Sequence, residues 1–348
     1  MKYRFYTKSD KAWAAMLEAI RGARKSILLE SFILTDDPKT HQLFETLKEK
    51  AKAGVKVKII IDRLAHFWFG SINRDAFTKA GAEVVVYNHW FYRNHRKTMI
   101  VDEEIGFAGG VNIRGAYAKW LDLHMMITGL FVKRLLSSFA RAYYLSGGRD
   151  PEILAFRKLP LGKLSATIYK AKTWLIERWP LRGKDVLKHY YKQKFAQASQ
   201  SITIVTPYFI PHKWLMRALR QAAGRGVKIE VIIPQKTDIA AIDLIHRPIA
   251  EHLSSWVNFY FMKRMNHAKV LLVDEKEGLV GSNNIDAQSF DYNLEASVIF
   301  QRKDMIGDLK KIIAEWKSEA VPLSELKEKS HWYHRILIKI IHWLEPIL

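Results

Sequence analysis

The chain has 348 residues, of which 49% are hydrophobic and 12% aromatic, so it is globular rather than disordered and can bury one large core or two ordinary ones, with two domains expected. It contains no cysteine, which excludes a disulfide framework and a cysteine-ligated zinc site. The formal net charge of +21 indicates a polyanionic partner, either nucleic acid or an anionic membrane surface, and 11 Trp and 14 Tyr slightly favour the membrane.

Residues 1–146 have the pattern of an α/β unit. The predicted elements are, in chain order, a helix over 9–24, a strand over 26–33, a helix over 41–53, strands over 55–62, 84–87 and 98–101, and a helix over 129–144. Gly54 ends the second helix, and Glu30 is a polar interruption in the first strand. No hydrophobic stretch resembles a signal peptide or reaches the length of about 18 apolar residues that a spanning helix needs.

Residues 147–187 are predicted to form a linker with short helices, because Gly147, Gly148 and three prolines interrupt the pattern. The stretch 170–179 is basic and aromatic, which suits either packing against a domain or contact with a membrane.

Residues 188–325 repeat the order of the first half. The predicted elements are a strand over 202–205, a helix over 214–223, and strands over 226–233, 257–261 and 270–273. Residues 326–348 close the chain as a basic amphipathic helix that is too short to span a bilayer and suits an anionic membrane surface. A helix docked on the core is the alternative for this segment.

One motif occurs twice, and each copy reads H-x-K-x-x-x-x-D. The copies are His95, Lys97 and Asp102 in the first half, and His267, Lys269 and Asp274 in the second. A small-residue turn and an asparagine follow at the same offset, ending in Asn112 and Asn284. The repeat indicates an internal duplication, and two such halves would pack about a pseudo-twofold axis that brings the motifs together.

The motif suits a phosphate better than a metal. Positions two apart on a strand share a face, so each histidine lies beside a lysine, and metal ligands would not have a cation between them. Lys97, Lys269, Asn112 and Asn284 could neutralise the oxygens of a phosphodiester without a metal or other cofactor. One imidazole could then attack phosphorus while the other protonates the leaving oxygen.

These motifs resemble those of the phospholipase D superfamily, and within it the chain is most similar to the bacterial cardiolipin synthases. Further points of similarity are Thr206–Pro211, Gly281–Asp286, Ser289 and Asn293–Glu295. The resemblance implies an α/β fold of two pseudo-twofold-related phospholipase D-type α/β/α sandwich halves, each a mixed sheet flanked by helices. Many cardiolipin synthases begin with spanning helices, and this sequence resembles a shorter kind without them.

The family also implies roles for individual residues. The reaction would pass through a phosphohistidine, with His95 as nucleophile and His267 as acid and base. Asp122 lies 27 residues after His95 and Glu295 lies 28 after His267, and acids at similar positions in the family orient the catalytic imidazoles. Asp102 and Asp274, at strand ends, are expected to be structural.

The expected function is a phosphatidyltransferase that makes cardiolipin and glycerol from two molecules of phosphatidylglycerol. Alternatives with the same chemistry are a phospholipase D and a phosphatidylserine synthase. A phosphodiesterase nuclease would also suit the charge, and a non-catalytic membrane-binding protein is a fourth interpretation. With the leading interpretation, the protein has an anionic phospholipid as its substrate and no nucleic acid partner. It would bind the cytoplasmic face of the cell membrane peripherally, through its basic surface and C-terminal helix.

Overall fold

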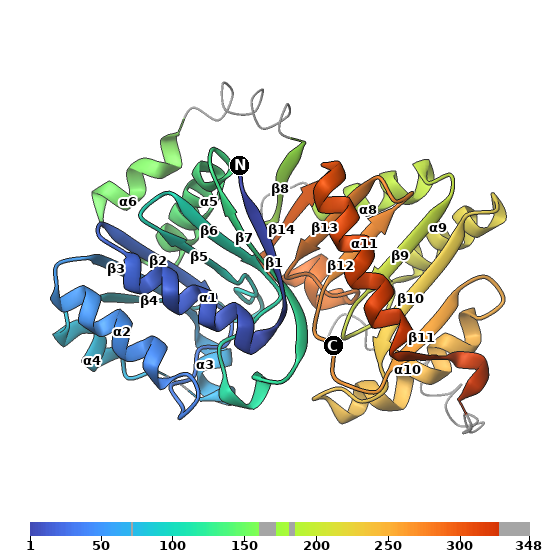
Figure 1. Ribbon diagram of the computed structural model, residues 1–348, viewed down its shortest axis with the longest axis horizontal. Coiled ribbons are helices and arrows are strands. Elements are labelled where there is room, and N and C mark those ends of the chain that lie inside the picture. The colour runs from blue at the N-terminus through green and yellow to red at the C-terminus, as the bar shows by residue number, and fades with distance from the viewer. Residues whose placement is uncertain (71, 160–171, 181–184, 327–348) are drawn as a thin grey trace.

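A computed structural model describes residues 1–70, 72–159, 172–180 and 185–326 of the protein (Figure 1). The first half contains, in chain order, β1 (Tyr3–Lys8), α1 (Ser9–Gly22), β2 (Ser26–Ser31), α2 (His41–Lys52), β3 (Lys56–Asp62), α3 (Arg63–Phe69), α4 (Arg74–Lys79), β4 (Glu83–Tyr87), β5 (Thr98–Val101), β6 (Ile105–Gly109), the 3-10 turn η1 (Gly115–Tyr117), β7 (Leu121–Thr128) and α5 (Phe131–Leu145). Short helices α6 (Pro151–Ala155) and η2 (Phe156–Lys158) follow.

The second half repeats this series. It contains β8 (Thr173–Arg178), α8 (Val186–Gln197), β9 (Ser201–Val205), α9 (Lys213–Gly224), β10 (Lys228–Pro234), α10 (Ala240–Leu253), β11 (Asn258–Met262), β12 (Val270–Val273), β13 (Glu277–Gly281), the π-helical turn η3 (Gln288–Tyr292), β14 (Glu295–Phe300), α11 (Lys303–Ser318), β15 (Ala320–Pro322) and η4 (Leu323–Glu325). Every helix and strand predicted in the two halves is present, with bounds within a few residues of those expected.

Each half is built on one mixed sheet. The first sheet has the order β1-β7-β6-β5-β2-β3-β4, with β2, β3 and β4 parallel and the other pairs antiparallel. The second has the order β15-β11-β10-β9-β12-β13-β14-β8, in which β9, β10 and β11 are parallel. Apart from β15 at its edge, the second sheet reproduces the first strand for strand. The duplication is therefore structural as well as sequential.

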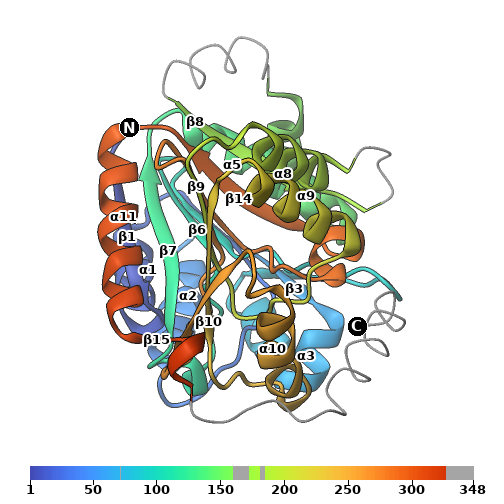
Figure 2. The same cartoon turned by 90° about the vertical axis from the view of Figure 1, so that its right-hand side faces the viewer.

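Helices cover both faces of the sheets, because the strands are apolar on both sides. In β2, Ile27 and Leu29 pack into the core under α1 and α2, whereas Leu28 between them faces a core that includes α5. That second core continues into the other half through β13, β14 and α11, so the two sheets share a buried layer (Figures 1 and 2). The predicted fold class of two α/β/α sandwich halves is confirmed.

The segment 147–187 differs from the prediction at one point. Residues Thr173–Arg178 form the strand β8, not a helix, and they pair antiparallel with β14 along its whole length, from Phe300 to Glu295. β8 takes the place in the second sheet that β1 has in the first, so the second half begins before residue 188. A six-residue edge strand carries little periodic signal, and its pairing partner lies more than a hundred residues later.

The predicted C-terminal helix over 326–348 lies outside the described residues from 327 onward. Among the helices that the structure describes, none combines the length and the apolar character needed to cross a bilayer.

Candidate active site

The two motifs meet where the halves meet. His95 precedes β5 and His267 precedes β12, and backbone hydrogen bonds cross between the halves beside each. The amide of His95 donates to the carbonyl of Leu294 (3.1 Å), and the amide of His267 donates to the carbonyl of Leu121 (2.7 Å). These crossings are related by exchange of the two halves, as a pseudo-twofold axis requires.

Each motif histidine is oriented by a carboxylate of the other half. His95 Nδ1 lies 3.1 Å from a Glu295 oxygen, and His267 Nδ1 lies 2.8 Å from Asp122 Oδ2. The spacing in the sequence relates each acid to the histidine of its own half, whereas in the structure each acid contacts the histidine of the other half. Because a carboxylate only accepts, Nδ1 carries the proton in both rings, and each Nε2 is left with its lone pair.

Glu295 sits in a dense set of donors. Its carboxylate accepts from the hydroxyls of Ser282 and Ser289 (2.8 Å for Ser289) and faces the amide of Asn293 at 3.5 Å. Burial works to raise the pKa of Glu295, but the neighbouring His95, Lys97 and Ser282 outweigh it and hold the pKa at about 2. Glu295 is therefore ionised at neutral pH and contacts Nδ1 of His95.

Asp122 is held more sparsely. Besides His267, it accepts from the amide of Leu123 at 2.7 Å. Burial raises the pKa of Asp122 to about 6, although the charge of Lys269 opposes the shift. Gly110 makes room for this carboxylate, since a Cβ there would lie 2.2 Å from Asp122 Oδ1. The second half has Ser282 at the position of Gly110, and its hydroxyl bonds to Glu295 instead.

Both imidazoles are neutral at neutral pH. Burial and the charge of Lys97 lower the pKa of His95 to about 4, and burial and Lys269 lower the pKa of His267 well below its usual value. A neutral imidazole with its Nδ1 proton fixed has a nucleophilic Nε2. A protonated His95 would lower the pKa of His267 further, so the two rings lie within electrostatic reach of each other.

The motif lysines are buried with the histidines, at 2% exposure for Lys97 and 1% for Lys269. Each Nζ donates to the carbonyl of the histidine two residues earlier, at 2.6 Å for Lys269. Burial lowers the pKa of Lys97 to about 7 and that of Lys269 to about 8, and the charge of Lys269 contributes to the shift at Lys97. Two such cations attract an anion that can pair with both of them.

Aromatic side chains line the imidazoles. Phe32 meets the His95 ring edge-on with centroids 4.9 Å apart, and Lys97 Nζ lies 5.3 Å from the Phe32 ring. Trp120 and Tyr208 flank His267 at 5.6 and 6.3 Å. These contacts could not be predicted from the sequence, because single aromatics after buried strands have no repeated spacing.

The two motif asparagines differ in their surroundings. Asn112 Oδ1 accepts from the amide of Ile33 at 3.3 Å, which leaves Nδ2 as its donor group. Asn284 donates its backbone amide to Ser289 at 2.9 Å, and its buried Oδ1 has no hydrogen-bond partner within the described part of the chain. Both are nearly buried at the ends of the turns that follow β6 and β13.

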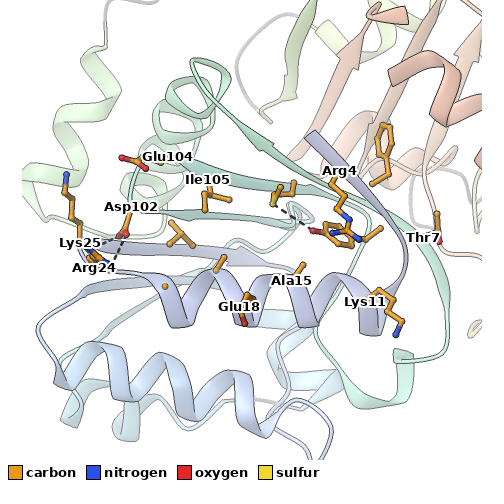
Figure 3. A pocket seen from close by; sticks show the side chains of 16 residues that line it. Arg4, Thr7, Lys11, Ala15, Glu18, Arg24, Lys25, Asp102, Glu104 and Ile105 are labelled. Carbon is orange, nitrogen blue, oxygen red and sulfur yellow. Dashed lines mark hydrogen bonds between the residues drawn. The ribbon is translucent and has the colours of Figure 1, made fainter. Parts of the chain in front are cut away.

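The motif aspartates lie at the opposite end of β5 and β12. Asp102 accepts from the amides of Arg24 and Lys25 (Figure 3) and from that of Ser26, at 2.7 to 2.9 Å. Asp274 accepts from three successive amides, of residues 199–201, in the same way. Burial works to raise their pKa values, but these bonds outweigh it and lower both. Their contacts are those of structural residues.

Asn94 and Arg96 are further polar residues of the first motif. Asn94 Nδ2 donates to Glu30 at 2.8 Å, which explains a carboxylate inside the strand β2. Arg96 is buried, with its Nε 3.4 Å from Glu30 and its Nη1 3.7 Å from Glu177 of β8. An asparagine precedes the histidine in both motif copies, and that repeat is the signal that could have predicted the role of Asn94.

Two other features lie apart from the histidines. A groove of about 1030 Å³ runs between α1 and the strands β1, β5, β6 and β7, and no motif histidine or lysine lines it (Figure 3). Among the described residues, one group has the spacing of metal ligands, the partly exposed Asp36, His41 and Glu45 at the start of α2. Such exposed groups are common without a metal.

Comparison with known proteins identifies the family. Residues 16–139 and 191–316, together more than half of the chain, match the family described as "Cardiolipin synthase, PLD-like domain". The chain belongs to this family of phospholipase D-like proteins. Both matched segments contain one motif, and the resemblance predicted from the two motifs is confirmed.

Named relatives agree with this assignment, and a solved structure shares the fold. The phospholipase D-like chain is 28% identical to cardiolipin synthase 2 of Bacillus anthracis, over 99% of its length and 70% of the relative. It is 29% identical to cardiolipin synthase A of Pseudomonas fluorescens, over 83% and 63% of the two chains. The crystal structure of phosphatidylserine synthase from Haemophilus influenzae superposes with a TM-score of 0.78 at 16% identity, covering 99% of this chain and 95% of that one, which shows a shared fold.

Proposed function

We propose that the protein is a phosphatidyltransferase that makes cardiolipin and glycerol from two molecules of phosphatidylglycerol. The observation that carries the proposal is the pair of neutral histidines, each held by a carboxylate of the other half, beside two buried lysines. The names of its relatives, which are cardiolipin synthases, support the choice of substrate.

In the first step, His95 Nε2 attacks phosphorus, a P–N bond forms, and the P–O bond to glycerol breaks. His267 gives its Nε2 proton to the departing alkoxide. The positive charge that develops on the His95 ring is stabilised by Glu295, which its low pKa keeps ionised. His95 is the better choice of nucleophile for this reason, since the carboxylate beneath His267 titrates at about pH 6.

In the second step, His267 removes the proton of a hydroxyl on a second phosphatidylglycerol. The resulting oxygen attacks phosphorus, the P–N bond breaks, and His95 is released as a neutral imidazole with His267 again protonated. His267 has a strongly lowered pKa without substrate. The negative phosphodiester favours its protonated form, so substrate binding prepares the acid that the first step needs.

Lys97, Lys269, Asn112 and Asn284 hold the non-bridging phosphoryl oxygens in this proposal. The lysines have the charge, and Asn112 has its Nδ2 oriented by the bond from Ile33 to its Oδ1. Together they neutralise the substrate as charge accumulates in the transition state. A chelator is therefore expected to leave turnover unchanged.

Substrate in a bilayer requires access from the membrane. We place the protein peripherally on the cytoplasmic face of the cell membrane, where anionic lipids attract a chain of net charge +21. The basic C-terminal stretch 326–348 would contribute to this attraction, and its role stays a prediction because nearly all of it lies outside the described residues.

The test is incubation of the purified protein with phosphatidylglycerol vesicles, followed by separation of the lipids and assay of free glycerol. Equal amounts of cardiolipin and glycerol are expected. Phosphatidic acid with glycerol would indicate water as the acceptor and a phospholipase D. Products that form only when serine is added would indicate a phosphatidylserine synthase, and cleavage of an oligonucleotide without lipid turnover would indicate a nuclease.

A further inference from the structure

Four large aromatic side chains are exposed together near the first motif. Phe67 and Trp68 on α3 are 82% and 68% exposed, and Trp90 and Phe91 in the loop 88–93 are 86% and 73% exposed. We call these four residues the aromatic rim. Soluble proteins rarely expose large apolar side chains in a group unless the group contacts a partner.

The helix α3, which carries two residues of the aromatic rim, also packs towards the imidazole of His95. On the inner side of α3, Phe69 packs against Phe32 with centroids 6.4 Å apart, and Phe32 meets the ring of His95 at 4.9 Å. Ala65 on the same side is buried. One side of α3 therefore packs towards the aromatic lining of the site, while Phe67 and Trp68 face solvent.

The base of α3 is tied to the first motif. Asp62 caps the helix by accepting from the amides of Leu64 and Ala65 at 3.0 and 3.1 Å, and its other oxygen accepts from the amide of Asn94 at 2.8 Å. Asn94 directly precedes His95. Movement of α3 is thus coupled to the residue next to the proposed nucleophile.

Hydrogen bonds within the loop 88–93 fix its conformation, with Trp90 and Phe91 exposed. Arg93 donates to the carbonyls of His89, Trp90 and Tyr92 at 3.1 to 3.2 Å. His89 Nδ1 accepts from the amides of Phe91 and Tyr92 at 3.2 Å. Because these bonds hold the loop in one conformation, binding through its aromatics should cost little conformational entropy.

The loop is also joined to α3, so the two exposed aromatic pairs stand on segments that are bonded to each other. Arg63 of α3 donates to Asn88 Oδ1 at 2.9 Å. Arg63 of α3 is exposed, and so is Arg74, whose charge acts on His66 of the same helix α3. In the second half, Ile239 and Leu244 at the start of α10 are 42% and 56% exposed, and α10 lies at the same end of the molecule as α3 (Figures 1 and 2).

We propose that the aromatic rim inserts into the headgroup region of an anionic bilayer and directs the site of His95 towards the membrane. This inference rests on the proposed function for its purpose, since a lipid must pass from the bilayer to the imidazole. Tryptophan and phenylalanine settle at the boundary between headgroups and acyl chains, and the arginines beside them match anionic headgroups.

The first experiment measures insertion directly. Intrinsic fluorescence is recorded with phosphatidylglycerol vesicles that contain lipids brominated near the headgroup, for the wild type and for Trp68→Phe/Trp90→Phe. Phenylalanine keeps the apolar surface and removes the fluorophore. We expect quenching in the wild type, reduced quenching in the double variant, and vesicle binding by both. Equal quenching in the two proteins would overturn the proposal.

The second experiment measures the contribution to binding. Trp90→Ser/Phe91→Ser should weaken sedimentation with phosphatidylglycerol vesicles by about ten-fold or more, because burying one aromatic is worth roughly that factor. The matched control is Tyr144→Ser/Leu145→Ser at the end of α5, where exposed residues at 40% and 48% lie outside the rim. Equal losses in both double variants, or no loss in either, would contradict insertion.

Turnover measurements distinguish membrane insertion from the proposed function. Loss of turnover in Trp90→Ser/Phe91→Ser should be about ten-fold greater on vesicles than on a detergent-dispersed short-chain lipid. If the wild type inserts by the rim but makes no cardiolipin, the rim stands and the proposed function fails. If the wild type forms a dimer that this double variant abolishes, with vesicle binding unchanged, the rim is a protein interface and the bilayer proposal fails.

Discussion

His95 and Glu295 are separated by 200 residues in the chain, and their side chains are 3.1 Å apart. His267 and Asp122 form the reciprocal pair across 145 residues at 2.8 Å. Neither half therefore contains a complete histidine–carboxylate pair of its own. Orientation of the imidazoles depends on the docking of the two halves.

Glu295→Gln should lower kcat by roughly a thousand-fold or more with little loss of stability. An amide cannot neutralise the charge on His95, and it can present its NH2 group to Nδ1 and select the wrong tautomer. Turnover and Tm are measured side by side. Glu277→Gln is the matched control, because Glu277 is a buried carboxylate bonded to Tyr190 and Lys194 outside the site. A Glu295→Gln enzyme with wild-type kcat would rule out this role.

The assignment of nucleophile and acid can be tested with a substrate whose leaving group needs no protonation, such as a phosphatidyl nitrophenol. His267→Ala should still release nitrophenol and accumulate a phosphatidyl adduct, since the acid is dispensable in that first step. His95→Ala should form no adduct. Intact-protein mass spectrometry detects the adduct, and an adduct on His95→Ala alone would reverse the two roles.

The pH dependence of kcat/KM should be bell-shaped and narrow. Phosphate binding needs charged lysines, so activity falls as pH rises through the pKa values of about 7 for Lys97 and about 8 for Lys269. Orientation of His267 needs ionised Asp122, so activity also falls as pH drops below about 6, and protonation of His95 near pH 4 removes the nucleophile.

The profile is recorded with a dispersed substrate, so that membrane binding does not contribute to it. Activity that stays level from about pH 5 to about pH 9 would contradict the assigned protonation states.

Gly110→Ala should reduce kcat while the fold persists. A Cβ at Gly110 would lie 2.2 Å from Asp122 Oδ1, so the carboxylate must shift and His267 loses its alignment. Gly22→Ala at the end of α1 is the control, because a Cβ there meets no atom within 4 Å. Kinetic assays and thermal unfolding of both variants provide the measurement, and an unaltered kcat in Gly110→Ala would show that Asp122 tolerates displacement.

The sequence predicted the repeated elements well, because the apolar strands 98–101 and 270–273 carry their signal locally. It could not predict which carboxylate orients which imidazole. Asp122 and Glu295 lie at nearly equal distances after the histidine of their own half, and that spacing is the same whether or not the halves exchange partners. The aromatic lining and the hydrogen-bond donors around Glu295 could not be predicted for a related reason. The residues that make these contacts do not recur at a regular spacing in the sequence.

The difference between Gly110 and Ser282 allows the two histidines to take different roles in the reaction. A dimer of identical subunits would place the same acid, with the same neighbours, beneath both rings. In a single chain, one acid is Glu295 with a serine bonded to it, and the other is Asp122 beneath a glycine. The fused chain can therefore give its two equivalent positions different proton affinities, which lets one ring specialise in bonding to phosphorus and the other in carrying protons.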